Sequence, residues 1–148
     1  MELTKEFNFS IAHILENYPG ECVNLHGHTY KLLITVESDI LEDGIVIDFV
    51  DFKDIVNKRF IEKIDHSFAY NTESKDAVVL EIANTLKKND RKVYECNFRT
   101  TCEMFSIHIF NLLKEEFAKL RINLKEVKLY EGSRSYSVYK GGFFKPEQ

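Results

Sequence analysis

Three histidines and one cysteine near the start of the chain are the side chains best suited to chemistry. Only Gly27 separates His26 from His28, and Cys22 stands four residues before His26. Because alternate side chains of an extended strand share a face, a His-x-His pair places two imidazoles side by side. Three neutral imidazoles suit Zn²⁺, and three protein ligands leave one coordination position open for water or substrate. Together with His13, the pattern therefore predicts a catalytic zinc site with a thiol beside it.

The apolar residues around each histidine indicate which way its ring points. Each histidine shares its strand parity with large apolar side chains. The two inward sets are Leu3, Phe7, Phe9, Ile11, His13 and Leu15, and His26, His28, Tyr30, Leu32, Ile34 and Val36. A lone histidine on an apolar face is more often a hydrogen-bonded core residue, and His108, inside a helical pattern, is interpreted in that way. Three converging histidines favour metal binding.

Composition and charge exclude several classes of protein. The 148 residues, 44% hydrophobic and 30% charged, suit one globular domain spanning 1–148. The formal charge of -4 and the scattered basic residues argue against nucleic acid as a partner. No apolar run approaches the length of a membrane span or a secretory signal. Three cysteines without CxxC spacing do not suggest a disulfide scaffold, so we expect a cytoplasmic protein that does not bind membranes.

The periodicity predicts an α+β fold, an antiparallel sheet with helices on one face. We expect strands at about 2–15 and 27–38, a turn region at 66–75, and further strands at 91–98 and 124–140. We expect Asp51 to cap the first helix, and a capping box of Thr100 and Glu103 to open a long third one. The buried stripes are Phe52, Ile55, Val56, Phe60 and Ile64; Val79, Ile82, Ala83 and Leu86; and Phe105, Ile109, Leu112, Leu113, Phe117 and Leu120.

Two acidic sites each allow a structural and a functional interpretation. Glu131 extends the buried face of the last strand region, so it either lies at a strand end that meets water or binds a ligand with donor groups, such as a planar heterocycle. Asp65 and His66 either close the first helix or form a histidine oriented by a carboxylate for proton transfer. The residues alone leave both questions open.

Several motifs in the same order resemble the 6-pyruvoyl-tetrahydropterin synthase and 6-carboxy-tetrahydropterin synthase family. The resemblance covers residues 7 to 139. Its motifs are Phe9-Ser10-Ile11-Ala12-His13, Cys22-Val23-Asn24-Leu25-His26-Gly27-His28, Val46-Ile47-Asp48-Phe49, Asp65-His66, Thr100-Thr101-Cys102-Glu103 and Tyr130-Glu131.

The resemblance implies a role for each candidate residue. It implies that His13, His26 and His28 bind Zn²⁺, that Cys22 is the catalytic thiol, and that Asp65 and His66 complete the proton-transfer set. It also implies that Glu131 anchors a pterin, with Glu103 and Thr101 at the substrate. The implied substrate is 7,8-dihydroneopterin triphosphate, and Lys31, Lys53 and Arg134 are available for its phosphates.

The implied fold is the tunnelling fold. Each subunit then contributes a four-stranded antiparallel sheet and two main helices, three sheets close into a barrel, and two trimers stack into a homohexamer. Family sites lie between subunits, so Asp65 and His66 are expected to meet Cys22 of a neighbouring chain.

The spacing of Cys22 from His26 resembles the bacterial carboxy enzyme of queuosine and deazapurine synthesis. Its products are 6-carboxytetrahydropterin, acetaldehyde and triphosphate. Pyruvoyl synthesis, the folate-branch side-chain lyase that uses a glutamate near Glu21, and a zinc-containing pterin-binding module without turnover stay open. The chain departs from the family at Thr100, where proline is frequent, and at Gly132, where threonine is common.

Overall fold

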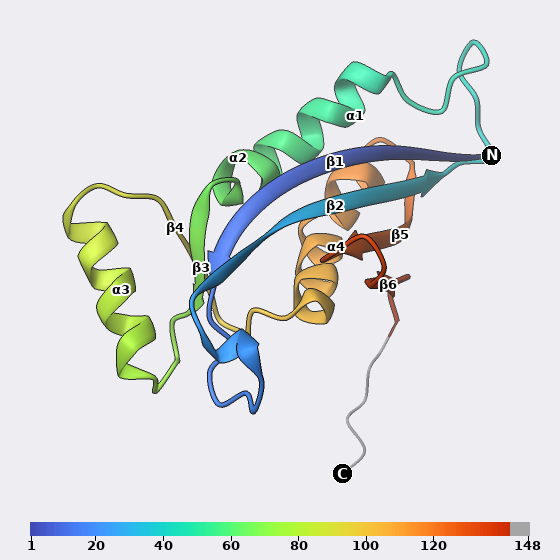
Figure 1. The fold of residues 1–148 in the computed structure, drawn as a ribbon. Helices are drawn as coiled ribbons and strands as arrows, with labels where there is room; N and C mark the ends of the chain where they lie inside the picture. Colours follow the sequence, from blue (N-terminus) through green and yellow to red (C-terminus); the bar gives the residue numbers. More distant parts are fainter. Residues whose placement is uncertain (143–148) are drawn as a thin grey trace.

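One curved sheet organises residues 1–142, the part of the chain that the structure, a computed structural model, describes (Figure 1). The six strands pair in the order β4-β3-β1-β2-β5-β6. They are β1 (Glu2–His13), β2 (His26–Glu37), β3 (Ser67–Asn71), β4 (Val93–Cys96), β5 (Asn123–Tyr130) and β6 (Tyr136–Tyr139). The helical segments are a short 3-10 turn (Glu21–Val23), α1 (Phe49–Val56), a π-helical turn (Asn57–Ile61), α2 (Glu62–Ile64), α3 (Ala77–Lys88) and α4 (Cys102–Lys119).

The predicted fold class is confirmed, with one addition. β1, β2, β5 and β6 form the expected antiparallel unit. The sheet is nevertheless mixed, because β3 pairs in parallel with β1 and β4 pairs in parallel with β3. The turn predicted for the whole of 66–75 is therefore wrong, since it contains β3. Residues 67–70 are all buried, and such a run shows no alternation from which a strand could be recognised.

The β1–β2 ladder is the longest pairing in the sheet. It runs without a break from Glu2 opposite Glu37 to His13 opposite His26. Because the register of a strand decides which side chains face the core, this pairing sends all the apolar residues of one parity to one face. The same register brings His13 and His26 together at its far end.

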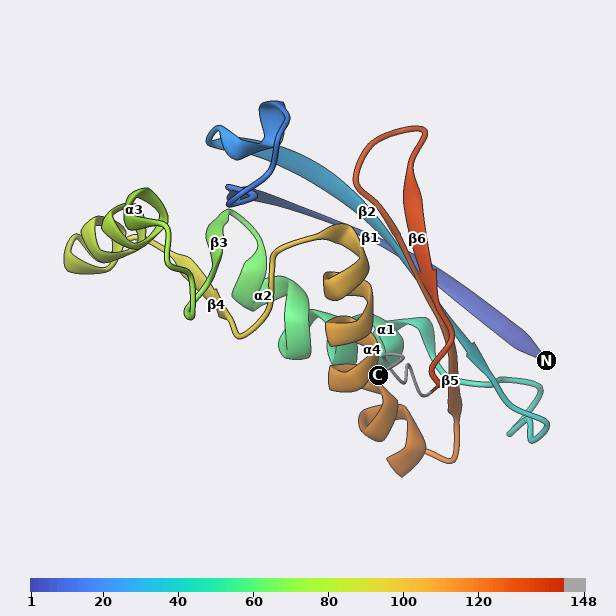
Figure 2. The same ribbon diagram turned by 90° about the horizontal axis from the view of Figure 1, so that it is seen from below.

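The helices cover that apolar face. α1, α2 and α4 pack against it, whereas α3 lies apart beside β3 and β4 (Figure 2). The largest fully buried side chains of the main core come from both layers: Tyr30, Phe9, Phe52, Phe60, Phe105, Phe117, Leu32, Ile34, Ile64, Ile109, Leu113 and Leu129. A second small cluster under α3 contains Ile14, Phe68, Tyr70, Val79 and Ala83. No helix in residues 1–142 is long and apolar enough to cross a membrane.

The first helix begins earlier than predicted. The N-cap of α1 is Asp48, whose side-chain oxygen accepts a hydrogen bond of 2.6 Å from the Val50 N–H. The expected cap at Asp51 is therefore wrong, because Asp51 lies inside the first turn. Asp48 and Asp51 have the same local preference for an N-cap position. Tertiary packing therefore determines which of the two begins the helix.

The long helix also differs from the prediction at both ends. Thr101, rather than Thr100, is the N-cap of α4, and its hydroxyl accepts a bond of 3.3 Å from the Met104 N–H. The capping box of Thr100 with Glu103 is therefore wrong by one residue, which leaves Glu103 without that structural role. Leu120 was expected in the buried stripe, but it ends the helix and is 49% exposed.

Candidate active site

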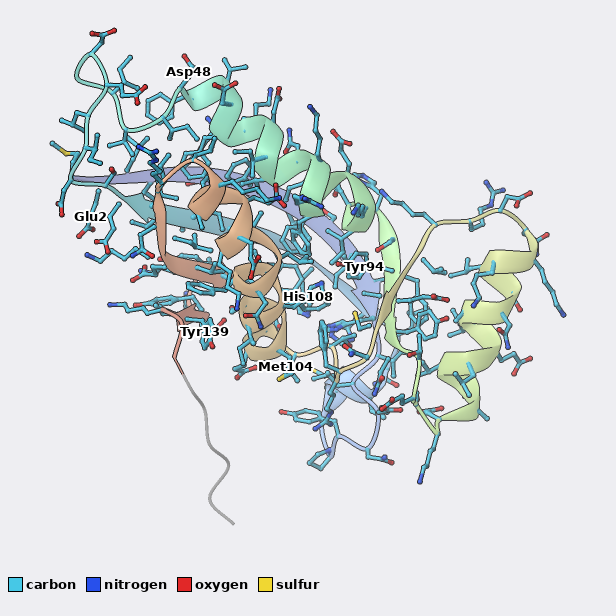
Figure 3. The ribbon with its side chains drawn as sticks, turned by 180° about the vertical axis from the view of Figure 1, so that it is seen from behind. Glu2, Asp48, Tyr94, Met104, His108 and Tyr139 are labelled. Atoms are coloured by element: carbon cyan, nitrogen blue, oxygen red, sulfur yellow. The ribbon has the colours of Figure 1, made fainter. Side chains whose placement is uncertain are left out.

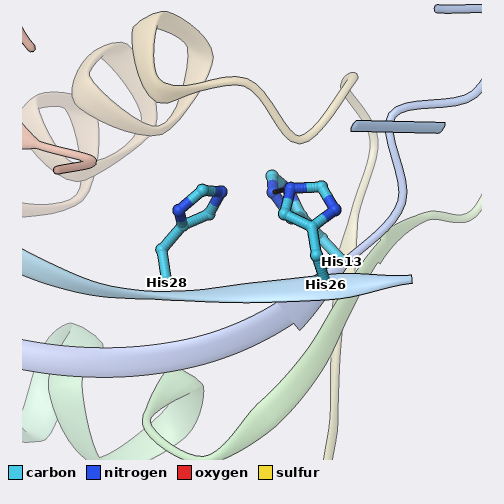
Figure 4. Close-up of side chains that lie close together, drawn as sticks. All are labelled: His13, His26 and His28. Carbon is cyan, nitrogen blue, oxygen red and sulfur yellow. Dashed lines mark hydrogen bonds between the residues drawn. The ribbon is translucent and has the colours of Figure 1, made fainter. Parts of the chain in front are cut away.

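The three predicted histidines converge at the end of the β1–β2 ladder. Their ligand nitrogens all lie within 4.8 Å of one another. His13 is fully buried, and His26 and His28 are half-buried. The rings stand on the same side of the two strands, facing the segment that leads into α4 (Figure 4). The inward parity predicted for the three side chains is therefore confirmed.

Backbone carbonyls orient two of the rings. Nδ1 of His13 lies 2.9 Å from the Thr100 carbonyl oxygen, and Nδ1 of His26 lies 2.7 Å from that of Asn24. Because a carbonyl only accepts hydrogen bonds, both Nδ1 atoms carry the proton of the neutral imidazole, and both Nε2 atoms present a lone pair. Such an orienting bond on the second ring nitrogen is typical of histidines that bind metals.

The free nitrogens match a metal ion in chemistry and spacing. The Nε2 atoms of His13 and His26 are 3.1 Å apart, close to the about 3.3 Å between two nitrogens that share a tetrahedral zinc. Nε2 of His28 is buried and has no hydrogen-bond partner. Facing lone pairs and an unpartnered buried nitrogen are both unfavourable unless a cation lies between them. The donor set therefore fits Zn²⁺.

The surroundings favour the neutral form of His13 and His28. Burial, with His26 and His28 nearby, lowers the pKa of His13 to about 4 against the opposing bond to Thr100. Burial also lowers the pKa of His28, against the effect of Glu131 and with a smaller contribution from His26. Since only the neutral imidazole binds metal, these shifts favour the metal-binding form near pH 7.

Gly27 allows the two strands to approach each other beside the histidines. A Cβ at Gly27 would lie 2.6 Å from the carbonyl oxygen of Ile11 on β1, which is closer than real contacts allow. Gly27 pairs with Ala12, next to the pair of His13 and His26. The glycine is therefore needed for the contact with β1, and any larger residue would push the histidine-bearing strands apart.

A cavity of about 310 Å³ brings together four other predicted site residues: Cys22, Thr101, Glu103 and Glu131. Cys22 lies in the 3-10 turn of the loop after β1, and its carbonyl accepts a bond of 2.9 Å from the Leu15 N–H. That bond holds the loop against the end of β1. A larger hollow of about 420 Å³ around Asp43 and Arg121 contains none of the predicted site residues.

Glu131 connects this cavity to the histidines. One carboxylate oxygen, Oε2, accepts a hydrogen bond of 3.2 Å from the Tyr30 hydroxyl. The other, Oε1, lies 3.8 Å from Nε2 of His28. Glu131 directly follows β5, and its side chain is 33% exposed. The strand-end position is confirmed, and Glu131 also lines the cavity, so its binding of a ligand stays a prediction.

Asp65 and His66 lie elsewhere in the single chain. They follow α2, and neither lines the cavity with Cys22. Oδ2 of Asp65 is 3.0 Å from Nδ1 of His66, whose side chain is 82% exposed. Partial burial raises the pKa of Asp65, but the bonds from the Ser10 N–H and from His66 outweigh it and hold that pKa below its usual value. The pair is therefore an ionised carboxylate orienting a solvent-exposed imidazole.

Backbone contacts hold this turn in place. The Ser10 N–H donates to Oδ1 of Asp65 at 2.8 Å, and the His66 N–H donates to the Ser10 carbonyl at 2.7 Å. The ammonium of Lys92 donates to the carbonyls of Glu62 and Asp65, each at 2.7 Å, and so satisfies free acceptors at the end of the helix. His66 itself has a left-handed φ of 61°, a conformation that non-glycine residues rarely adopt.

The sequence analysis missed several residues of the cavity. Tyr18, Cys102, Ser135, Tyr136 and Ser137 also line it. Tyr30 was assigned to the inward face, but nothing in its parity indicated that β5 would pair with β2 and bring Glu131 to its hydroxyl. The cavity lining includes none of the basic residues suggested for phosphate binding, Lys31, Lys53 and Arg134.

His108 is a structural histidine, as predicted. It is half-buried on α4, and its Nε2 lies 2.7 Å from the hydroxyl of Tyr94 on β4 (Figure 3). Burial lowers its pKa. The contrast with the converging trio shows that burial alone does not make a histidine a metal ligand.

Comparisons with known proteins agree with this geometry. Residues 2–142 match the family model described as 6-pyruvoyl tetrahydropterin synthase. The 6-carboxy-5,6,7,8-tetrahydropterin synthase of Haemophilus influenzae is 37% identical, covering 94% of this chain and 98% of the relative. The enzyme of that name from Aquifex aeolicus is 33% identical, covering 94% of this chain and 97% of its own. Among solved structures, Plasmodium vivax 6-pyruvoyltetrahydropterin synthase superposes with a TM-score of 0.72 at 25% identity, over 97% of this chain and 98% of that one.

Proposed function

The chain belongs to the 6-pyruvoyl tetrahydropterin synthase family, and we propose that it is a zinc-dependent 6-carboxy-5,6,7,8-tetrahydropterin synthase. In this reaction 7,8-dihydroneopterin triphosphate and water are converted to 6-carboxytetrahydropterin, acetaldehyde and triphosphate. The observation that carries the proposal is one continuous site, in which a three-histidine cluster adjoins a cavity that holds a thiol and a carboxylate. The similarity to the relatives from Haemophilus influenzae and Aquifex aeolicus supports the carboxy branch.

In the proposed mechanism Glu131 and Cys22 act from the two sides of the cavity. The Glu131 carboxylate accepts hydrogen bonds from adjacent N–H groups of the pterin and so fixes the ring. Cys22, as a thiolate, removes a proton from the substrate side chain. His13, His26 and His28 would hold Zn²⁺, which when bound would supply electrostatic stabilisation of negative charge developing on the substrate side chain.

Asp65 and His66 relay protons during the rearrangement. Because they do not line the cavity of their own chain, we propose that they enter the site of a neighbouring subunit in a homohexamer built from two trimers. The exposed His66 side chain is available for that contact, and Asp65 orients it. A small-molecule substrate and three free thiols are consistent with the expected cytoplasmic location.

A structural zinc is the non-enzymatic alternative, and the ligand set argues against it. Structural zinc sites are normally closed by a fourth protein ligand. Within residues 1–142 the cluster consists of the three histidines, and Cys22 is not part of it. The open position favours a catalytic site over a pterin-binding module.

Glu21 gives one specific reason to keep a second enzymatic candidate. It is adjacent to Cys22 in the same 3-10 turn, and it accepts a bond of 3.3 Å from the Asn24 side chain. In Plasmodium vivax 6-pyruvoyltetrahydropterin synthase a glutamate has been replaced as a catalytic residue. The folate-branch cleavage of the side chain would use a base of this kind.

Product analysis distinguishes these candidates. The zinc-loaded protein is incubated with 7,8-dihydroneopterin triphosphate, and the products are identified by mass spectrometry. We expect 6-carboxytetrahydropterin together with acetaldehyde, and no turnover by the Cys22→Ala variant at full zinc content. A pyruvoyl side chain, or a shortened side chain whose formation depends on Glu21, would replace the carboxy assignment. No product at full zinc occupancy would leave only the binding module.

A further inference from the structure

Tyr30 is the one fully buried tyrosine among residues 1–142, and its hydroxyl reaches the candidate site. It lies on β2, two residues after His28, and donates a hydrogen bond of 3.2 Å to Oε2 of Glu131. We propose that Tyr30 is a positioning residue that aims the Glu131 carboxylate at the pterin and thereby controls the affinity for the ring. This inference rests on the proposed function of Glu131 and adds a residue to it.

The packing around the ring holds the hydroxyl in one place. The Tyr30 ring is stacked on Phe9, with centroids 5.0 Å apart and an interplanar angle of 9°. Phe105 and His28 meet it edge to face at 6.2 Å and 5.6 Å. A side chain enclosed on these sides has no alternative rotamer, because core side chains are packed at crystal-like density. The donor is therefore in position before any ligand arrives.

The carboxylate, in contrast, is free to turn unless something holds it. The side chain of Glu131 is 33% exposed, and its second oxygen lies 3.8 Å from His28, beyond hydrogen-bond distance. Of the hydrogen bonds found in residues 1–142, the bond from Tyr30 is the one made to its side chain. Each carboxylate oxygen has two acceptor sites, so the bond leaves both oxygens able to accept from a ligand.

The chemistry of the pair suits this role. The Tyr30 hydroxyl donates and the Glu131 carboxylate accepts, with 3.2 Å between the two oxygens. A bond between a neutral donor and a charged acceptor is stronger than one between neutral groups. A hydroxyl fixed in the core can thus hold a partly exposed carboxylate in the orientation that binds the ligand.

A purely structural explanation is that a buried hydroxyl needs some partner, and Glu131 happens to supply it. Tyr94 offers a matched control for this explanation. It is half-buried, and its hydroxyl bonds to a side chain, His108, at 2.7 Å. Tyr94 does not line the cavity, so Tyr94→Phe removes a comparable bond without touching the site.

The first test compares Tyr30→Phe with Tyr94→Phe in the zinc-loaded protein. For Tyr30→Phe we expect the dissociation constant for 7,8-dihydroneopterin, measured by fluorescence titration, and the KM for its triphosphate to rise about 10-fold. We expect kcat to change less than about threefold, with unchanged zinc content. Tyr94→Phe should change neither constant. Equal losses of affinity in the two variants would overturn the proposal.

A double-mutant cycle separates positioning from general destabilisation. If Tyr30 acts through Glu131, Tyr30→Phe should have no further effect on kcat/KM or pterin affinity in a Glu131→Ala background. An undiminished effect in that background would contradict the inference.

If the wild-type protein bound no pterin, that result would count against the proposed function. A measurement without ligand still tests the role of Tyr30 in that case. In a crystal structure of Tyr30→Phe we expect the Glu131 carboxylate to leave its wild-type position. A carboxylate unmoved in that structure would refute the positioning role of Tyr30, whatever the protein turns over.

Discussion

The histidine cluster is brought together within one chain, whereas the Asp65–His66 turn meets none of the other candidate site residues of its own chain. The histidines stand on two strands joined by an unbroken ladder, and their surroundings already provide the tautomers that a metal requires. Asp65 and His66 are equally well fixed by Ser10 and Lys92, but the imidazole points into solvent.

The difference suggests a division of labour between copies of the chain. Binding groups that need a dry environment lie between the sheet and α4, where burial lowers histidine pKa values. The Asp65–His66 pair, whose imidazole is exposed, is ordered outside the cavity of its own chain. If this division holds, one copy supplies the metal and the pterin anchor, and another supplies the proton relay.

The largest effect should come from mixing two inactive variants. Cys22→Ala and His66→Ala should each lower turnover by more than about 1,000-fold. If the site is shared between subunits, unfolding and refolding the two together should restore roughly one quarter of wild-type activity, because random mixed assemblies contain intact sites. The measurement is kcat of the mixture, with each variant refolded alone as the control. Failure to recover activity in confirmed mixed hexamers would place both residues in the same subunit's site.

Removing one histidine should abolish the metal site without involving the turn. We expect His28→Ala to weaken zinc binding more than about 100-fold, since only two ligands remain. His108→Ala is the matched control, because that histidine bonds to Tyr94 instead of the cluster. Zinc per chain is measured by atomic emission after dialysis. One zinc per chain in His28→Ala would show that the three-histidine site is wrong.

The metal-free protein should lose stability as the pH falls. The folded-state pKa of His13 is about 4, below its value of 6.5 in the unfolded chain, so the unfolded state binds more protons between these values. The contribution of neutral His13 to the free energy of unfolding is fully present above pH 6.5. About 3 kcal/mol of it is lost as the pH falls to about 4. Urea unfolding with a chelator measures the loss, and a His13→Asn variant should show a flatter dependence. Identical pH dependence in both proteins would contradict the assignment.

The smallest effect is expected at Lys92, which holds the exposed turn. Lys92→Met removes the two bonds to the carbonyls of Glu62 and Asp65, and we expect kcat to fall about 3- to 10-fold with unchanged KM and zinc content. Lys87→Met is the control, because Lys87 bonds to Glu95 and Tyr70 away from the turn. A loss of zinc in Lys92→Met would instead connect the two regions within one chain.

The sequence predicted correctly those segments in which apolar residues recur with a single clear period. The alternation along β1 and β2 predicted the burial of His13 and the convergence of the three rings, because an alternating pattern places side chains on a face whatever the partner strand. β3 was missed for the opposite reason. Its side chains are buried on both faces, so they show no alternation, and flanking turn residues dominated the prediction.

Local sequence periodicity does not predict cavities or hydrogen bonds between residues far apart in the chain. The bond between Tyr30 and Glu131 joins residues 101 positions apart, and it depends on the register of β2 against β5. The cap of α4 at Thr101 instead of Thr100 is a choice between identical neighbours that packing decides. The roles of Cys22, Asp65 and His66 came from the family resemblance, and the geometry of a single chain does not supply them.

The π-helical turn at Asn57–Ile61 decides where the chain points when it leaves the helix. A π turn holds one residue more than an α-helical turn, and Phe60 in this turn is buried in the core. Deleting one residue there would restore a regular helix and rotate everything after it by about 100°. Asp65 would then face away from the backbone of Ser10, so the one extra residue of the π turn sets the direction in which Asp65 and His66 leave the helix.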